Sequence, residues 1–192
     1  MRLVHTAAEL DEILAEVRSE RTIGFVPTMG ALHKGHLSLI TQSQTDENFT
    51  VVSIFVNPLQ FSSEDDYEGY PRTLGVDARL LTDASVDVLF APSASEVFPK
   101  DQVFLEPDPG ALGERFEGEF RPGHFAGMLK VVSRLFDLVV PDRAYFGEKD
   151  AQQAALVKKM VEDQVASGQR EPVSVVVCPT IRSETGLALS SR

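Results

Sequence analysis

The sequence predicts an α/β fold with a Rossmann-like, doubly wound parallel sheet, in which helices cover both faces. Short apolar runs of strand length alternate with runs of helical period along most of the 192 residues. The strand-length runs are apolar on both faces, which is typical of central parallel strands. Segments rich in polar, chemically useful side chains follow several of these runs, at the edge where parallel sheets bind ligands. The length suffices for one domain, which we expect to span residues 1–192.

The first half of the chain opens with a helix. Thr6 and Glu9 form a capping-box pattern, and apolar residues follow at helical spacing until about residues 18–20. The further elements expected in this half are a strand at 22–26 closed by Pro27, a helix at 34–44, a strand at 50–56, a polar loop at 57–70, a helix at 76–82 and a strand at 86–91.

The second half begins with a segment rich in proline and glycine, residues 93–122, which predicts irregular structure. A run with the apolar periodicity of a buried helix follows and is stopped by Pro141. The elements expected after residue 122 are this helix at 125–139, a strand at 144–146, a helix at 151–165 and a strand at 173–178.

Composition restricts the class of protein. The formal net charge is −11, and such an acidic surface argues against nucleic acid as a partner, because phosphate binding needs clustered cations. No apolar run approaches the length of a bilayer span, and the first residues do not form a signal peptide, so we expect no membrane partner and a cytoplasmic location. The single cysteine, Cys178, excludes an intramolecular disulfide and a cysteine-based metal site.

The strongest chemical signal is Pro-Thr-Met-Gly-Ala-Leu-His-Lys-Gly-His, at residues 27–36, between a predicted strand and a predicted helix. Helix N-termini offer N–H groups and partial positive charge to anions, and Gly30 and Gly35 let a phosphate approach the backbone. His33 and His36 lie on one face of the helical turn and can donate hydrogen bonds to phosphate oxygens. The segment is neither a P-loop nor a Gly-x-Gly-x-x-Gly motif, and it lacks a third ligand for zinc.

Three weaker motifs lie elsewhere. Residues 146–150, Phe-Gly-Glu-Lys-Asp, again join a predicted strand to a predicted helix. Lys149 in this segment either supplies a positive charge to a triphosphate or is an ordinary surface lysine. Asn57 and Gln60 follow the next strand, so their amides either hold a hydroxy acid or form a polar turn. The Ser-Ser-Arg sequence at 190–192 offers two hydroxyls and a guanidinium to phosphates.

Taken together, the motifs resemble one family. Their order along the chain is Pro-Thr-Met-Gly-Ala-Leu-His-x-Gly-His, Phe-Val-Asn-Pro-x-Gln-Phe, Tyr-Pro-Arg-Thr, His-Phe-x-Gly, Phe-Gly-Glu-Lys-Asp and Leu-Ala-x-Ser-Ser-Arg. This order resembles the pantothenate synthetases, ligases of the His-x-Gly-His nucleotidylyltransferase superfamily. The resemblance implies an ATP-dependent condensation of pantoate with β-alanine to pantothenate, through a pantoyl-adenylate, with release of AMP and pyrophosphate. It also implies Mg²⁺ as the cofactor accompanying ATP, and a homodimer.

The resemblance further implies roles for individual residues. His36 would act as proton donor, with His33 and Lys149 as its catalytic partners. The residues implied in ATP binding are Met29, Gly30, Ala31, Leu32, His33, Lys34, Gly35, His36, Gly147, Glu148, Lys149, Asp150, Ile181, Leu189, Ser190, Ser191 and Arg192. The residues implied in binding pantoate or β-alanine are Gln60, Gln153 and Asn57, with His124 nearby. Asp77 would contribute to binding Mg²⁺.

The chain departs from the family pattern in two places. Ala151 stands where many members carry tyrosine. The family continues after Ser-Ser-Arg into a smaller domain that covers the cleft, so we expect residues 1–192 to be the nucleotide- and pantoate-binding N-terminal domain, with weak ligase activity. Two alternatives are a nucleotidylyltransferase for a phosphorylated acceptor, which would favour Arg or Lys over Gln60 and Gln153, and a binding module without turnover.

Overall fold

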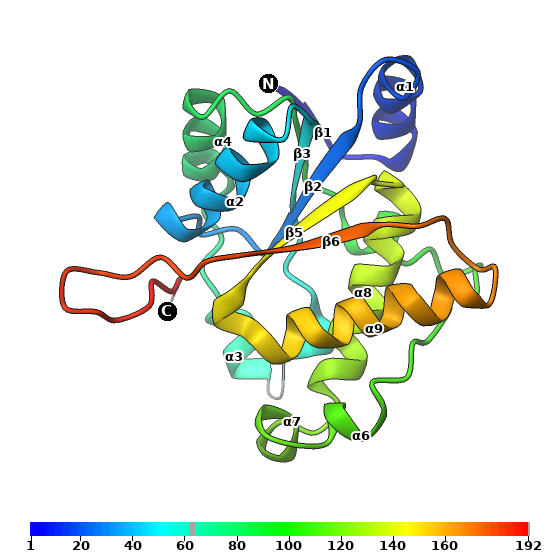
Figure 1. Cartoon of the computed structure of the whole chain (residues 1–192), viewed down its shortest axis with the longest axis vertical. Helices are drawn as coiled ribbons and strands as arrows, with labels where there is room; N and C mark the ends of the chain where they lie inside the picture. The colour runs from blue at the N-terminus through cyan, green and yellow to red at the C-terminus, as the bar shows by residue number, and fades with distance from the viewer. Residues whose placement is uncertain (62–63, 192) are drawn as a thin grey trace.

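The structure, a computed structural model, describes residues 1–61 and 64–191 and contains, within them, one six-stranded parallel sheet (Figure 1). The strands are β1 (Arg2–Val4), β2 (Ile23–Thr28), β3 (Phe49–Ile54), β4 (Val88–Phe90), β5 (Arg143–Gly147) and β6 (Ser174–Cys178). Their spatial order is β1-β4-β3-β2-β5-β6, and every pair is parallel. The predicted parallel α/β fold is confirmed.

This strand order creates a switch point between β2 and β5. From β2 the chain adds β3 and then β4 on one side, whereas β5 and β6 lie on the other side. The segments that leave the carboxyl ends of β2 and β5 therefore start next to each other and diverge. Open parallel sheets bind ligands in the crevice that forms at such a point.

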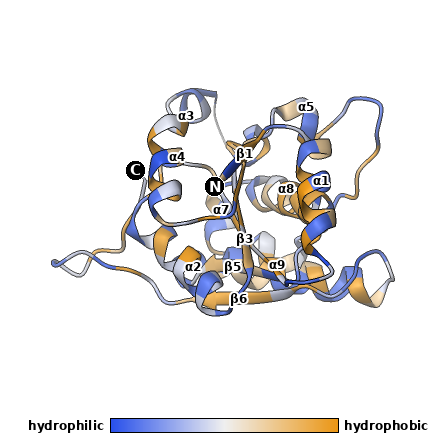
Figure 2. Cartoon of the chain, turned by 90° about the horizontal axis from the view of Figure 1, so that it is seen from above, coloured by the Kyte–Doolittle hydropathy of each residue, from blue (hydrophilic) through white to orange (hydrophobic). Residues whose placement is uncertain are grey.

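Helices cover both faces of the sheet, as expected (Figure 2). The longer ones are α1 (Ala7–Val17), α2 (Lys34–Thr45), α4 (Leu74–Asp83), α8 (His124–Val139) and α9 (Ala151–Ala166). The first core cluster joins α1, α8 and α9 to one face through residues such as Phe25 and Val51. A second cluster joins α2 and α4 to the opposite face through Val26 and Val52. Neighbouring strand residues thus serve opposite layers, which explains why the strands are apolar on both faces.

Helices α1 and α8 form for the reasons that the sequence suggested. Thr6 accepts a hydrogen bond from the Glu9 backbone, and the Glu9 side chain accepts one from the Thr6 backbone, so both halves of the capping box exist. Helix α8 is buried on most of its surface, and Val140, in a left-handed conformation with φ of 43°, ends it before Pro141. No helix of the described residues is long and apolar enough to cross a membrane.

Two strand predictions were wrong. We assigned no strand to the first residues, but β1 pairs with β4; it has only three residues, of which only Val4 is buried, so its sequence shows no apolar pattern. The sequence also predicts that the strand at 22–26 ends before Pro27, whereas β2 continues to Thr28. The Thr28 carbonyl points toward β3, because it accepts a hydrogen bond from the N–H of Phe55, directly after that strand. Successive residues of a strand point their backbone groups to opposite sides, so those of Pro27 point toward β5. The pairing of β5 with β2 already stops at Phe25. The missing N–H of the proline therefore interrupts no ladder.

The segments predicted to be irregular contain short helices. They are η1 (Pro58–Gln60) and α3 (Glu64–Glu68) in the first loop, and α5 (Ala94–Val97), α6 (Gly110–Gly113) and α7 (Glu117–Phe120) in the second. A further single turn, η2 (Glu148–Asp150), leads into α9. Each is five residues or shorter, which is too short to show helical periodicity. Their importance is positional, because η1, α7 and η2 all border the cleft described next.

Candidate active site

A cleft of about 410 Å³ opens at the carboxyl edge of the sheet, between β2 and β5. The predicted site residues that line it are Met29, His33, Gly35, His36, Gln60, Gly147, Lys149, Asp150, Gln153, Ile181, Leu189, Ser190 and Ser191. The predicted residues of the described chain that do not line it are Gly30, Ala31, Leu32, Lys34, Asn57, Asp77 and Glu148. Arg192, also predicted to bind ATP, lies outside the described residues.

The two histidines of the first motif cap helix α2. The Nδ1 atom of His33 accepts a hydrogen bond from the Gly35 backbone N–H at 3.0 Å. In return, Nδ1 of His36 accepts one from the His33 backbone N–H at 3.3 Å. This is the reciprocal geometry of a capping box, built from two imidazoles in place of a hydroxyl and a carboxylate. The rings lie with their centroids 4.2 Å apart.

The capping box fixes the tautomer of both rings. A backbone N–H can only donate, so each Nδ1 must be unprotonated and each neutral ring carries its hydrogen on Nε2. Burial, followed by repulsion from His33, lowers the pKa of His36 to about 4. Burial and the nearby Lys149 charge also lower the pKa of His33. Near neutral pH the cleft is therefore lined by two neutral imidazoles whose free edges are Nε2–H donors.

Glycine at position 35 is required by the packing of the His33 ring. A Cβ atom there would lie 2.8 Å from Cε1 and 2.9 Å from Nδ1 of His33, closer than such atoms can approach. Gly30 has a different reason, since its φ of 81° belongs to the left-handed region that favours glycine. Gly30 thus allows the conformation of the turn, and Gly35 leaves space for the imidazole of His33.

Asp77 holds the turn between β2 and α2. It lies on α4, is 2% exposed, and accepts hydrogen bonds from the backbone N–H groups of Ala31 and Leu32 at 3.0 and 2.9 Å. The hydroxyl of Thr73 donates a third bond at 3.0 Å. The carboxylate is thus occupied by the protein and does not line the cleft. A magnesium ion that accompanies ATP takes most of its ligands from phosphates and water, so the contribution of Asp77 to Mg²⁺ binding stays a prediction.

One expectation about the turn needs correction. We expected free backbone N–H groups to face the phosphates, but the amides of Ala31 and Leu32 donate to Asp77, and those of His33 and Gly35 donate to the imidazoles. The donors that remain toward the cleft at this turn are chiefly the Nε2–H groups. The partial positive charge of the α2 N-terminus persists, since it arises from the whole helix.

The second motif lines the same cleft as the first. Lys149 pairs with Asp150, Nζ to Oδ1 at 2.8 Å, and both side chains are partly exposed. The charge of Lys149 lowers the pKa of His33 and His36, while that of Asp150 raises the pKa of His36, so the two motifs share one electrostatic environment. The pairing of β2 with β5 brings together segments that are more than 100 residues apart in sequence.

Gln60 and Asn57 form one unit at the floor of the site, but only Gln60 lines the cleft. Gln60 donates through Nε2 to the sulfur of Met29 at 2.9 Å. Asn57 is 1% exposed and donates to both Gln60 and the Gly127 carbonyl, while its oxygen caps η1. The structure therefore makes Asn57 a support for Gln60 and corrects the expectation of direct substrate contact.

Gln153 reaches the cleft from the first turn of α9. It has no hydrogen-bond partner among the described residues, so its amide is available to a ligand. Its neighbour Gln152 faces away and binds the turn before α7, donating to the carbonyls of Leu112 and Arg115 and accepting from the Glu117 backbone. The first turn of α9 thus serves both the cleft and its rim.

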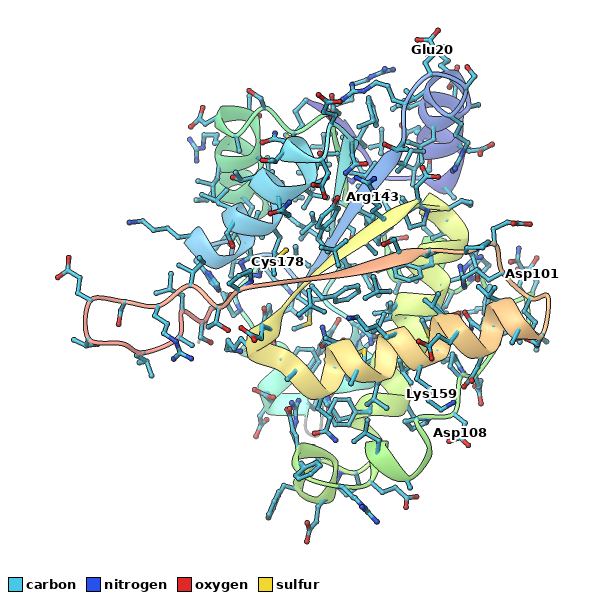
Figure 3. All side chains as sticks on the ribbon, in the orientation of Figure 1. Glu20, Asp101, Asp108, Arg143, Lys159 and Cys178 are labelled. Carbon is cyan, nitrogen blue, oxygen red and sulfur yellow. The ribbon has the colours of Figure 1, made fainter. Side chains whose placement is uncertain are left out.

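The final described segment returns to the first motif. Cys178, labelled in Figure 3, ends β6 in register with Gly147, so the following residues start beside the second motif. The chain then projects as a loop, visible in Figure 1, and closes on itself where the Leu189 N–H donates to the Ile181 carbonyl. Ser191 donates to the carbonyl of Ala31 at 2.9 Å. Ser191 therefore lies against the histidine turn, 160 residues earlier in the chain.

The sequence analysis missed Arg121 and Glu117, which also line the cleft. Arg121 Nη1 pairs with Glu117 at 2.6 Å, and Nη2 donates to the Gln60 carbonyl at 3.2 Å. His124, which the resemblance placed near the substrates without a role, also binds that carbonyl through Nδ1 at 2.7 Å. The spacing of an arginine three residues before a histidine was the only available signal, and the irregular segment around it gave no means of placing it.

The fold and the cleft together define a class. A parallel doubly wound sheet with paired imidazoles, a lysine and serines in a cleft at its switch point has the architecture of the nucleotide-binding α/β proteins.

Comparison with known proteins identifies the family within that class. The sequence profile of the family described as "Pantoate-beta-alanine ligase" matches residues 2–192, and this chain belongs to that family. The pantothenate synthetase of Agrobacterium fabrum is 53% identical over an alignment of 193 positions, which covers 100% of this chain and 64% of that protein. The chain thus spans slightly less than two thirds of the length of such relatives.

Solved structures of the same family have the same fold. The pantothenate synthetase of Thermus thermophilus superposes with a TM-score of 0.88 at 51% identity, covering 100% of this chain and 66% of that one. The pantoate-β-alanine ligase of Francisella tularensis, solved with "Beta-gamma ATP" and β-alanine, superposes with a TM-score of 0.91 at 41% identity. The match covers 100% of this chain and 71% of that one.

Proposed function

We propose that this chain binds ATP and pantoate and forms pantoyl-adenylate, the first step in the condensation of pantoate with β-alanine to pantothenate. The observation that carries the proposal is the pair of imidazoles whose Nε2–H donors are fixed by the capping box. The family of the chain supplies the substrates, since its relatives are pantothenate synthetases and one was solved with an ATP compound and β-alanine.

The first step needs charge stabilisation at a phosphate. A pantoate carboxylate oxygen attacks the α-phosphorus of ATP, a new P–O bond forms, and pyrophosphate leaves with the electrons of the broken bond. The Nε2–H groups of His33 and His36 donate to the phosphoryl oxygens as negative charge moves onto them. Lys149 supplies a full positive charge, close enough to lower the pKa of both histidines. The proposal needs only hydrogen bonds from the two rings to the phosphates, and the role of His36 as proton donor stays a prediction.

The second step needs a positioned acyl group. The amine of β-alanine attacks the carbonyl carbon of the adenylate, the amide bond forms, AMP leaves, and the amine loses a proton. Gln60 and Gln153 hold the hydroxy acid, since both amides line the cleft and that of Gln153 has no partner within the described chain. Neutral amides suit hydroxyl and carboxylate groups, whereas a phosphorylated acceptor favours bidentate cations.

The segment after β6 supports the phosphate end of the site. Ser190 and Ser191 line the cleft, so their hydroxyls would meet the triphosphate there, while Arg192 lies outside the described residues and stays a predicted ATP-binding residue. Met29, Gly147, Asp150, Ile181 and Leu189 complete the ATP-binding walls in this proposal. We place residues 1–192 in the nucleotide- and pantoate-binding domain of a cytoplasmic homodimer, and light scattering at micromolar concentration tests the dimer.

The direct test is pantoate-dependent exchange of labelled pyrophosphate into ATP. Exchange requires reversible adenylate formation and needs no β-alanine, so it isolates the first step. We expect exchange that depends on D-pantoate and is absent with an analogue that lacks the carboxylate. ATP binding without any pantoate-dependent exchange, at saturating concentrations of both, would contradict the proposed function.

A further inference from the structure

The cleft has a second charged end that the proposed adenylation step does not use. Among the described residues that line it, the side chains with permanent positive charge are Lys149 and Arg121. Lys149 lies beside the histidines, and Arg121 lies beside the backbone of Gln60. Building on the proposed function, we propose that Arg121 recognises the carboxylate of β-alanine, which takes the place of Glu117 on the guanidinium.

Arg121 is held firmly in position. Its Nη2 donates to the Gln60 carbonyl at 3.2 Å, and its Nη1 lies 3.2 Å from Nε2 of His124. Since a carbonyl can only accept, His124 must donate to Gln60 through Nδ1–H, and a neutral ring then accepts from Arg121 through Nε2. The guanidinium, the imidazole and the Gln60 carbonyl therefore form a closed ring of hydrogen bonds. A cation fixed in this way binds an anion with little loss of side-chain entropy.

The guanidinium still has donors for a ligand. Of its five N–H groups, those used within the described residues are two on Nη1, toward Glu117 and His124, and one on Nη2, toward Gln60. The Nε–H and the second Nη2–H have no acceptor in the described chain. If Glu117 leaves, Nη1–H is released as well, and planar carboxylates match such paired donors.

Glu117 is suited to leave. Its side chain is 47% exposed, so the carboxylate can return to water at small cost, and an ion pair at this exposure is worth little. Its backbone is anchored by Gln152, so the side chain can swing out while the wall of the cleft stays in place. Replacing one carboxylate by another leaves the local charge unchanged.

The position of Arg121 also orients the ligand, because its guanidinium contacts the backbone of a residue that lines the cleft. Gln60 connects the two ends, since its backbone contacts Arg121 and its side chain contacts Met29. An amine substrate anchored by its carboxylate at Arg121 would therefore extend toward the acyl group held at Gln60.

The test compares β-alanine with β-alaninamide, which keeps the amine and lacks the carboxylate. Binding of each is measured by NMR titration of this chain, with pantoate and a non-hydrolysable ATP analogue present. Wild type should bind β-alanine about 10-fold or more tightly than β-alaninamide. Arg121→Gln should weaken the binding of β-alanine by about 10- to 100-fold, which is the range for losing hydrogen bonds to a charged group. The same substitution should change the affinity for β-alaninamide by less than about threefold. Arg79→Gln, on the exposed surface of α4, is the matched control and should change neither.

Glu117→Gln distinguishes ligand exchange from a structural role. Removing the competing carboxylate should tighten β-alanine binding by a few fold, whereas loss of a structural ion pair would weaken it or leave it unchanged. The inference is overturned if wild type does not bind β-alanine, if it binds both amines equally, or if Arg121→Gln weakens both equally. Pyrophosphate exchange without β-alanine, run on the same samples, reports separately on the proposed function, so the failure of one is distinguishable from the failure of the other.

Discussion

The two nitrogens of the His36 ring have separate tasks, and two substitutions separate them. In His36→Asn the amide oxygen can occupy the position of Nδ1 and accept from the His33 N–H, but the Nε2–H donor is lost. In His36→Gln the terminal amide nitrogen can occupy the position of Nε2, but the capping acceptor is lost. We therefore expect stability and adenylation to respond in opposite ways in the two variants.

The magnitudes follow from the contacts. Losing a helix-capping acceptor costs about 0.5–2 kcal/mol, so His36→Gln should have the lower free energy of unfolding. Losing a donor to the developing charge costs about 10²–10³-fold, so His36→Asn should have the lower rate of pyrophosphate exchange. His36→Gln should keep a larger part of that rate. A matched control is Thr41→Ala, on the exposed side of α2, which should change neither the exchange rate nor the cap.

The same ring makes stability depend on pH. The folded pKa of His36 is lowered to about 4, below its unfolded value near 6.5, because burial disfavours the charged ring. The unfolded state therefore binds the proton more readily, and the stabilisation present above pH 6.5 is lost as the pH falls from about 6.5 to 4. A shift of this size corresponds to roughly 3 kcal/mol. In His36→Asn this loss should be absent.

The free energy of unfolding is measured by urea denaturation at about pH 7.5, 5.5 and 4.5, which span the titration of His36. The rate of adenylation is measured by labelled pyrophosphate exchange at about pH 7.5. The reasoning is refuted if His36→Asn exchanges within a factor of about two of wild type. It is also refuted if His36→Gln is the less active of the two, or if NMR shows the ring titrating near its ordinary pKa of about 6.5 in the folded protein.

Three further substitutions test other parts of the site. Asp77→Asn should destabilise the fold by about 1–3 kcal/mol, because an amide N–H would face a backbone N–H; recovery of exchange by excess Mg²⁺ with unchanged stability would indicate a metal ligand instead. Gly35→Ala should displace the His33 ring and weaken ATP binding, measured by calorimetry, and an unchanged ATP affinity would show that the ring position is unimportant. Gln153→Ala should weaken pantoate binding by about 10-fold while ATP binding changes by less than about threefold, and equal losses for both ligands would remove its proposed role.

The sequence by itself determined most of the regular structure. The capping box of α1, the end of α8 before Pro141 and the alternation of buried strands with helices depend on neighbouring residues, and local patterns report them well. The histidine motif was recognised for the same reason, since its strand, its turn and its helix are contiguous. The resemblance of the motifs to one family also predicted the family membership that the comparisons confirmed.

Only the tertiary structure decided what several polar side chains do. Asp77 binds amides more than 40 residues away, Asn57 is closed off by the Gly127 carbonyl, and Arg121 reaches the cleft from a segment without periodicity. The residue type gave the chemistry in each case, but its partner is set by how distant segments pack. A carboxylate can bind a metal, a backbone amide or nothing, and only the neighbours supplied by the fold determine which of these has the lowest free energy.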